Sequence, residues 1–132
     1  MDPVKFRNKH GPEWRIQKEL VDFLKARLWH VERMIGNAYQ FGIPDLYIGH
    51  TRYGTRWIDV KNPVDYEFTK QQKKKWPVWE RYGIGIWIIT GATQEEYAKL
   101  FEPPNWRKYW KPKYDEEPTI DELLEELNEP TD

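Results

Sequence analysis

The sequence lacks cysteine, long apolar runs and internal repeats, and these absences exclude several classes of protein. Without cysteine the chain forms no disulfide bonds, zinc–thiolate sites or thiol nucleophiles, and it suits a reducing compartment. No run approaches the ~20 consecutive apolar residues of a membrane-spanning helix, and residues 1–20 carry too many charges for a secretory signal peptide. We therefore expect a cytoplasmic protein that does not bind a membrane, and its 132 residues predict one domain.

Basic residues are also absent from the C-terminal end, although the whole chain has a net charge of only −1. Nine of the 22 acidic residues follow Tyr114, so residues 1–114 carry 21 basic and 13 acidic side chains, a net charge of +8. Such a basic body either binds a polyanion or is neutralised by its own tail. We predict a single domain over residues 1–114 and an acidic tail over residues 115–132. Thr119 should cap a short amphipathic helix over residues 120–128, whose apolar stripe suits the basic body, a second subunit or a partner.

Two predicted strands, residues 46–50 and 56–61, flank the turn Tyr53-Gly54-Thr55 and should form a hairpin. If the hairpin is symmetric about position 52, Asp45 lies opposite Asp59, about 5 Å away. The same symmetry pairs Leu46 with Ile58 and Ile48 with Arg56. Alternation divides the side chains between two faces of the hairpin. One face takes Leu46, Ile48, Ile58 and Val60, and the other takes Asp45, Tyr47, Trp57, Asp59 and Lys61.

Like charges at this separation repel, so the carboxylates of Asp45 and Asp59 need a compensating group. A divalent cation such as Mg²⁺ or Mn²⁺ supplies one, because hard cations prefer carboxylate oxygens and take their other ligands from water or a phosphate. Lys61 shares this face and would point at the same phosphate. The alternative is structural, with Asp45 as a turn residue after Pro44 and Asp59 paired with Lys61.

Pro12 suits the first position of a helix that runs to about Leu28, and residues 1–11 are predicted to form an irregular basic arm. The apolar arc of this helix contains Ile16, Leu20, Phe23, Leu24 and Leu28. Glu13 lies near the centre of the arc, with Gln17 beside it. Glu13 therefore either reaches the metal or is a solvated residue that the helix dipole stabilises.

A second helix is predicted from its N-cap Thr69 to Tyr82, with Gln72 on the inward face. The Gln72 amide either holds Lys61 or a metal-bound water, or it is a structural hydrogen-bonding group. The other predicted elements are a strand over residues 29–35, a buried strand over residues 84–90 at the centre of the sheet, and a helix over residues 94–101 capped by Thr93.

Basic side chains that could contact DNA phosphates occur in two places. They are Lys70, Lys73, Lys74 and Lys75 on the second helix, and Arg107 and Lys108 in the aromatic segment 106–114. A solvated helix face and aromatic rings packed over the sheet explain the same residues, so both interpretations stay open.

Pro44-Asp45, followed by Asp59-Val60-Lys61, resembles the signature of the PD-(D/E)xK nuclease superfamily. Four segments in order are similar to the stand-alone virus-type replication-repair nuclease module, VRR-NUC, and to Holliday junction resolvases. They are Glu13-x-x-Ile16-Gln17, Gly42-Ile43-Pro44-Asp45-Leu46, Asp59-Val60-Lys61 and Thr69-Lys70-Gln71-Gln72-Lys73. Two residues depart from the resemblance: Asp59 replaces the commoner glutamate, and Gln17 stands where archaeal resolvases carry their helix glutamate.

The resemblance implies an α/β fold with a restriction-endonuclease-like αβββαβ core over about residues 12–90, a mixed central sheet flanked by helices, and a C-terminal helical extension. It also implies a metal-dependent DNA endonuclease that hydrolyses phosphodiester bonds in branched or junction DNA, acts as a homodimer, comes from a phage or bacterium, and needs no organic cofactor. The implied Mg²⁺ or Mn²⁺ ligands are Asp45, Asp59 and the main-chain carbonyl of Val60, with Glu13 in that site or in a second one. Lys61 would position the nucleophile and offset transition-state charge, while Gln72 and Gln17 would orient these groups.

Two alternative functions remain. One is a sequence-specific homing or restriction-type endonuclease on the same core, which would cut plain duplex DNA at one site. The other is a DNA-binding protein without catalysis, which would show no metal-dependent nicking.

Overall fold

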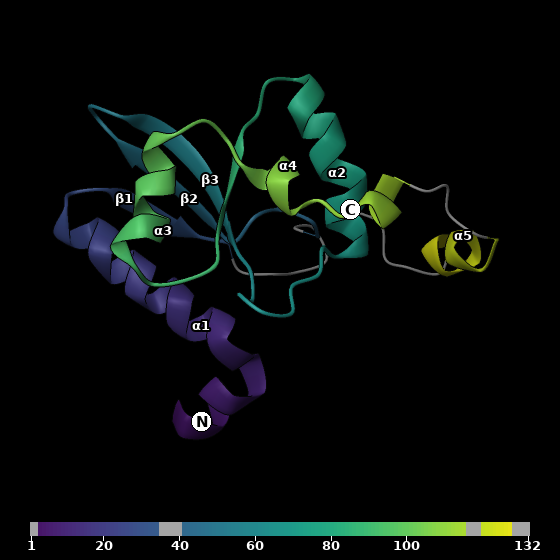
Figure 1. Ribbon diagram of the computed structural model, residues 1–132, viewed down its shortest axis with the longest axis horizontal. Coiled ribbons are helices and arrows are strands. Elements are labelled where there is room, and N and C mark those ends of the chain that lie inside the picture. Colours follow the sequence, from purple (N-terminus) through teal and green to yellow (C-terminus); the bar gives the residue numbers. More distant parts are fainter. Residues whose placement is uncertain (1–2, 35–40, 116–119, 128–132) are drawn as a thin grey trace.

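The structure, a computed structural model, describes residues 3–34, 41–115 and 120–127 and has an α/β architecture (Figure 1). Its strands are β1 (His30–Arg33), β2 (Leu46–His50), β3 (Gly54–Val60) and β4 (Ile86–Ile89). Its α-helices are α1 (Pro3–Ala26), α2 (Lys70–Arg81), α3 (Gln94–Ala98), α4 (Trp106–Tyr109) and α5 (Ile120–Leu127), with 3₁₀-helices η1 (Lys99–Phe101) and η2 (Pro112–Asp115). A helix, three strands, a helix and a fourth strand follow one another, which confirms the predicted α/β class with a mixed sheet flanked by helices.

The four strands form one sheet in the order β1-β2-β3-β4. The first two pairings are antiparallel, and β3 runs parallel to β4. The register of the hairpin is the predicted one, because Leu46 pairs with Ile58 and Ile48 with Arg56. The strand β3 begins earlier than expected, at Gly54, whose positive φ of 83° suits the end of a tight turn. The register matters for the site, because it decides which residues of the two strands face each other.

The sheet separates two hydrophobic clusters. On one face α1 and α3 cover the strands, and the buried residues are Ile16, Leu20, Val21, Leu24, Trp29, Leu46, Ile48, Ile58, Val60, Trp87, Ile89, Tyr97 and Leu100. On the other face lie α2 and α4, and the buried residues are Phe68, Trp76, Ile86, Ile88 and Trp106. The predicted apolar face of the hairpin is confirmed, since its four residues all belong to the first cluster. Each buried aliphatic side chain there stabilises the fold by about 1.5–3 kcal/mol.

The strand β4 is an edge strand, so the prediction that it forms the centre of the sheet is wrong. Its residues Ile86–Ile89 are all buried because helices cover both faces, and that burial alone explains their continuous apolar run. Asn105 closes the open edge. Its Oδ1 accepts a hydrogen bond from the Ile88 N–H at 2.6 Å, and its Nδ2 donates to the Ile88 carbonyl at 3.2 Å. A buried side-chain amide thus satisfies backbone groups that a neighbouring strand would otherwise bind.

The first helix begins well before Pro12, so the prediction of an irregular arm over residues 1–11 is wrong for residues 3–10. Those residues are helical, and Gly11, with φ 67° and ψ −163°, separates them from a second helical run that starts at Pro12. Glycine adopts this backbone conformation without a side-chain clash. The predicted role of Pro12 as a first helical residue is therefore confirmed.

The helix α1 ends at Ala26, two residues earlier than predicted. Leu28 adopts a left-handed φ of 67° and is 85% exposed, so it does not belong to the apolar arc. The Trp29 N–H donates to the Leu24 carbonyl at 3.1 Å and satisfies one of the last helical carbonyls.

The helix α2 has its predicted N-cap, Thr69, and ends at Arg81, one residue before the predicted end. The Thr69 hydroxyl accepts from the Gln72 N–H at 3.1 Å, and the Gln72 Oε1 accepts from the Thr69 N–H at 3.0 Å. This reciprocal pair is a capping box. The predicted N-cap Thr93 is confirmed as well, but α3 is short and continues as η1.

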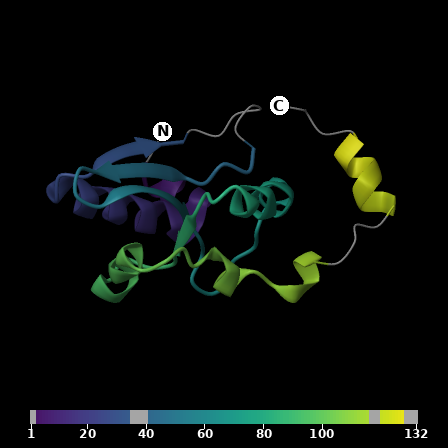
Figure 2. The same ribbon diagram turned by 90° about the horizontal axis from the view of Figure 1, so that it is seen from above.

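Aromatic residues of segment 106–114 pack against α2 and the loop before it. The rings of Trp106 and Trp76 lie 5.9 Å apart, and those of Tyr114 and Phe68 lie 5.5 Å apart. The packing interpretation therefore accounts for these aromatic rings. Figures 1 and 2 place α5 at the opposite end of the long axis from the hairpin turn. The ends of its predicted helix, Thr119 and Asn128, lie outside the described residues. Over the described ranges, no helix combines the length and apolar character needed to cross a membrane.

Candidate functional site

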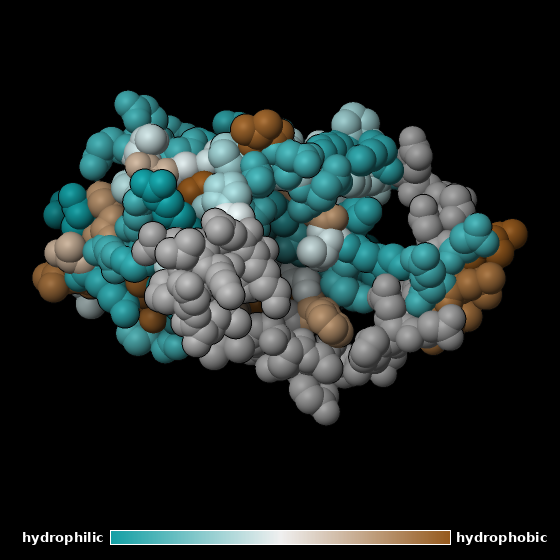
Figure 3. Space-filling model, turned by 90° about the horizontal axis from the view of Figure 1, so that it is seen from below, coloured by the Kyte–Doolittle hydropathy of each residue, from teal (hydrophilic) through white to brown (hydrophobic). Residues whose placement is uncertain are grey.

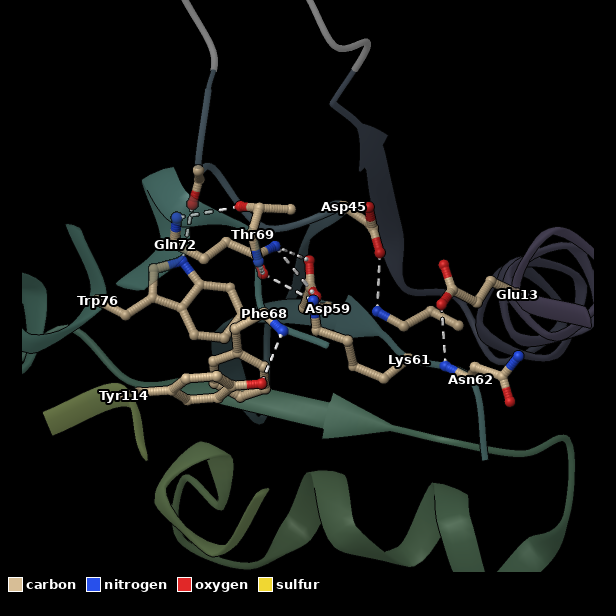
Figure 4. Close-up of polar contacts among 12 residues, drawn as sticks. Glu13, Asp45, Asp59, Lys61, Asn62, Phe68, Thr69, Gln72, Trp76 and Tyr114 are labelled. Carbon is tan, nitrogen blue, oxygen red and sulfur yellow. Dashed lines mark hydrogen bonds and ion pairs between the residues drawn. The ribbon is translucent and has the colours of Figure 1, made fainter. Parts of the chain in front are cut away.

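The acidic residues of the hairpin meet at the end of the sheet where β2 begins and β3 ends (Figure 4). Asp45 directly precedes β2, Asp59 lies in β3, and the Leu46–Ile58 pairing extends to place these two residues opposite each other. Their carboxyl groups are close enough for the charge of Asp59 to raise the pKa of Asp45. The structure thus brings together the two carboxylates that the hairpin register predicts.

Asp45 is partly buried and is held by the neighbouring strand. Its Oδ2 accepts a hydrogen bond from the Val60 N–H at 2.8 Å. Burial, followed by the nearby charge of Asp59, holds the pKa of Asp45 well above its ordinary value of 3.8. The charged form of this carboxylate is therefore unfavourable unless a cation offsets it.

Asp59 is only 2% exposed and contacts two hydrogen-bond donors. The Lys61 Nζ lies 3.0 Å from its Oδ2, and the Gln72 Nε2 lies 3.3 and 3.4 Å from its two oxygens. Burial raises the pKa of Asp59, and this effect outweighs the Lys61 ammonium and the hydrogen bonds, which lower it. The structural alternative from the sequence, an Asp59–Lys61 pair, is thus present in the same site.

Lys61 is buried by aromatic rings and fixed by Gln72. Its Nζ donates to the Gln72 Oε1 at 2.7 Å and lies 4.9 Å from the ring centroid of Phe68 and 5.7 Å from that of Trp76. The same Oε1 is the atom that completes the capping box with Thr69. Gln72 thus contacts Lys61 and also makes a structural hydrogen bond in the capping box, so both of its predicted contacts within the protein are seen. The N-terminus of α2 serves both the fold and the site.

A glycine sets the distance between α2 and the loop that leads to Asp45. Gly42 has a φ of 81°, and a Cβ at this position would lie 2.9 Å from backbone atoms of Gln71. Trp76 then donates from Nε1 to the Gly42 carbonyl at 2.7 Å. Both features hold this loop against the helix that carries Gln72.

A cleft of about 190 Å³ opens beside Asp45 and is lined by Glu13, Trp14, Gln17, Asp45 and Val60. Glu13 enters it from α1, on the side of Asp45 away from Gln72 (Figure 4). Its Oε1 accepts from the Asn62 N–H at 3.0 Å, which ties α1 to the end of β3. Glu13 and Gln17 thus line the cleft beside Asp45, while Glu13 is exposed and its carboxylate binds the Asn62 backbone, so its predicted metal contact stays a prediction. Glu19, by contrast, pairs with Arg15 on the exposed side of α1.

The donors around this cleft fit a hard cation in chemical type. Asp45 and Asp59 supply carboxylate oxygens, and Glu13 lines the same cleft. Within the described part of the chain, however, no three or more carboxylate, histidine or cysteine side chains are grouped closely enough to hold a metal ion. A cation at the aspartate pair would therefore complete its coordination with backbone carbonyl, water or phosphate oxygens, unless Glu13 moves from Asn62.

The predicted DNA-binding residues differ in the contacts that they make within the protein. Lys70 pairs with Glu125 of α5 at 3.0 Å, and the Lys73 ammonium lies 4.8 Å from the Tyr114 ring centroid. Lys74 and Lys75 follow on α2. Arg107 binds Glu80 through Nε and Nη2 at 3.0–3.2 Å and covers Trp106, whereas Lys108 is exposed.

Comparisons with protein-family models, with curated proteins and with solved structures found no match to this chain. The resemblance to nucleases therefore rests on the motif residues and on the site they form.

Sequence reasoning missed three residues that support the site. Phe68 lies in a loop that looks polar, yet its ring covers Lys61. The Tyr114 hydroxyl donates to the Glu67 Oε2 at 2.6 Å and accepts from the Phe68 N–H at 3.3 Å, which fixes that loop from a distant part of the chain. Hydrogen bonds from Tyr114 and Lys111 lower the pKa of Glu67 to about 2. Asn62 binds Glu13 through its backbone, so no side-chain pattern could have revealed this contact.

Proposed function

We propose that this protein is a divalent-metal-dependent DNA endonuclease that hydrolyses phosphodiester bonds, with branched or junction DNA as its substrate class and a homodimer as its working form. One observation carries the proposal. Two facing carboxylates, Asp45 and Asp59, lie next to a buried lysine that an amide holds in place, and Asp45 lines an open cleft. Metal-assisted hydrolysis of a phosphodiester uses such groups: anionic metal ligands, a fixed positive charge and room for the phosphate.

The donor set suits Mg²⁺ or Mn²⁺, held by Asp45, Asp59 and the Val60 carbonyl, with Glu13 in that site or a second one. When bound, such an ion lowers the pKa of a coordinated water and polarises the scissile phosphate. The raised pKa values of both aspartates support this assignment, because two buried carboxylates that repel each other are relieved by a cation.

Lys61 supplies the fixed positive charge. Contacts to Asp59 at 3.0 Å and to Gln72 at 2.7 Å hold its ammonium in one position. A preorganised charge stabilises the additional negative charge of the pentacovalent transition state at little reorganisation cost. Gln72 acts through Lys61 and Asp59 as a positioning residue, and Gln17, on the wall of the cleft, takes a similar role beside Asp45.

A DNA-binding protein without catalysis is the second candidate, and the buried network itself favours it. Among the described residues every buried side-chain nitrogen or oxygen has a hydrogen-bond partner. Asp59, Lys61 and Gln72 therefore satisfy one another without a metal. In this case the network stabilises the sheet edge, and the basic body binds DNA without cutting it.

A cleavage assay separates the two candidates. The purified chain is incubated with Mg²⁺, Mn²⁺ or EDTA and with matched linear duplex, flap, four-way junction and single-stranded DNA. We expect metal-dependent cutting of the branched substrates by the wild type. Cutting of plain duplex at one sequence would instead indicate the homing or restriction-type function.

Variants tie the activity to the site. Asp59→Asn removes one charge, and Lys61→Met removes the ammonium while keeping the volume of the side chain. Asp22→Asn is the matched control, because Asp22 pairs with Lys18 on the exposed side of α1. We expect both site variants to lose cutting and the control to retain it, with circular dichroism verifying the fold of each. Equal cutting by wild type and Asp59→Asn, or DNA binding without any cutting, contradicts the nuclease assignment.

A further inference from the structure

The C-terminal helix α5 is strongly acidic. Its sequence, IDELLEEL, contains four acidic residues and no basic one. Its apolar residues Ile120, Leu124 and Leu127 are largely exposed, and they form the hydrophobic patch at the right-hand end of Figure 3. Its described acidic side chains, Asp121 and Glu125, are exposed and can face a basic surface.

A described contact joins α5 to the basic helix α2. The Lys70 Nζ lies 3.0 Å from the Glu125 Oε2, across 55 residues of sequence. Lys70 is the first residue of α2, next to the cap residue Thr69 and two residues before Gln72. The acidic helix therefore contacts α2 at the end that delivers Gln72 to the candidate active site.

The chain that leads to α5 is fixed against the same helix. The Tyr114 ring lies 5.5 Å from the Phe68 ring and 4.8 Å from the Lys73 ammonium, and its hydroxyl donates to Glu67. The Trp110 Nε1 then donates to the Asp115 Oδ1 at 2.8 Å. Only residues 116–119 separate Asp115 from α5. A tether this short keeps α5 at an effective concentration on the order of millimolar near α2.

We propose that α5 is an intramolecular competitor of DNA: it binds Lys70 at the start of α2 and must leave before the phosphate backbone of DNA can bind the lysines of this helix. The proposal rests on the proposed function only in naming DNA as the displaced ligand. Lys70, Lys73, Lys74 and Lys75 then have two alternative anionic partners, the acidic tail and DNA. Because both contacts are electrostatic, the tail selects for substrates that engage enough phosphates to displace it.

The absence of cysteine allows α5 to be locked in place. In the full-length double variant Lys70→Cys/Glu125→Cys, the only two thiols lie where the ion pair was. A bis-maleimide that spans the two removed side chains links them, and the same variant capped with N-ethylmaleimide is the matched control. Fluorescence anisotropy with a labelled four-way junction in EDTA then measures DNA affinity without cleavage.

We expect a monomer carrying one linker, identified by mass, and DNA affinity about tenfold or more below that of the capped control. Failure of the intramolecular link to form overturns the proposal, and so does equal affinity of the linked and capped proteins. If neither form binds DNA, the proposal also falls. Loss of metal-dependent cutting alone does not affect it, because affinity is read in EDTA, so the two failures are distinguishable.

Charge reversal tests the same contact without a linker. Glu125→Lys repels Lys70 and should raise DNA affinity about fivefold relative to Glu19→Lys, which makes the same charge change on the exposed side of α1. Equal gains in the two variants would show that only net charge matters, and would overturn a specific role for α5.

Discussion

Neighbouring residues at the end of β3 are equally buried but stabilise the protein in different ways. Ile58 and Val60 face α1 and α3 within an apolar cluster, whereas Asp59 and Lys61 face α2. The apolar pair needs only apolar neighbours that fill the space around it, because the hydrophobic effect has no direction. The charged pair needs particular partners, because a buried charge without them costs several kcal/mol.

The two faces of β3 therefore constrain the sequence differently. On the apolar face, another aliphatic residue of similar volume would maintain the fold. On the charged face, one amide contacts both ions, and that amide is held in place by the cap of its own helix. Burying these charged groups costs free energy, and they lie next to Asp45, which lines an open cleft. Such a combination is typical of a functional site. Four variants test this contrast between the two faces.

The largest effect is expected from Asp45→Asn, which removes a charge from the charged face while its amide oxygen can still accept from the Val60 N–H. Loss of a metal ligand should reduce cleavage about a thousandfold, equivalent to about 4 kcal/mol of transition-state stabilisation. Single-turnover cleavage of a four-way junction measures it. Wild-type rates in this variant would place the reacting metal elsewhere.

Ile58→Ala, on the apolar face, should act on stability instead. Its side chain is completely buried, so the cavity should lower the free energy of unfolding by about 3 kcal/mol. Urea denaturation measures this loss, and cleavage below the unfolding transition should stay close to wild type. A variant that keeps its stability but loses cleavage would contradict the division between the two faces.

The pH dependence of stability should differ between the wild type and Asp45→Asn. The raised pKa of Asp45 means that, above the ordinary value of 3.8, the folded chain holds a proton that the unfolded chain releases. In metal-free buffer the free energy of unfolding should therefore fall as the pH rises from about 4 through the raised pKa. Asp45→Asn has no such proton, so the fall should be smaller. Urea denaturation across this range tests the sign, with Asp22→Asn as the control expected to match wild type.

The smallest effects distinguish two helix caps. Thr69→Ala and Thr93→Ala should each cost about 1 kcal/mol of stability, because each removes a hydroxyl that accepts from a helical N–H. Only Thr69 positions Gln72, so only Thr69→Ala should also slow cleavage, by about tenfold. Thermal denaturation and initial cleavage rates measure both quantities. Equal cleavage rates in the two variants would remove the link between the α2 cap and the site.

Local patterns predicted much of this arrangement from the sequence. The turn between two β-forming segments fixed the pairing of Asp45 with Asp59, and the Thr69 cap with Gln72 three residues later identified the start of α2. Helical periodicity also selected Glu13, rather than Glu19, as the residue that faces the hairpin. Each prediction depends on residues close in sequence, or on a register that a short turn determines.

Features that depend on distant residues were not predictable in this way. The continuous apolar run of β4 suggested a central strand, but its edge is closed by Asn105, a single side chain from a later loop. The rings that surround Lys61 come from a loop and a helix that Tyr114 helps to fix. Local composition does not show which of many aromatic residues will meet, because that depends on how the whole chain packs.

Metal binding by the aspartate pair is the central claim, and isothermal titration of Mn²⁺ into the metal-free protein tests it most directly. We predict a saturable site in the wild type and in Asp22→Asn, and its loss in Asp45→Asn and Asp59→Asn. If Mn²⁺ does not bind the wild type, or binds all four proteins equally, then Asp45 and Asp59 do not form a metal site and the nuclease assignment is contradicted.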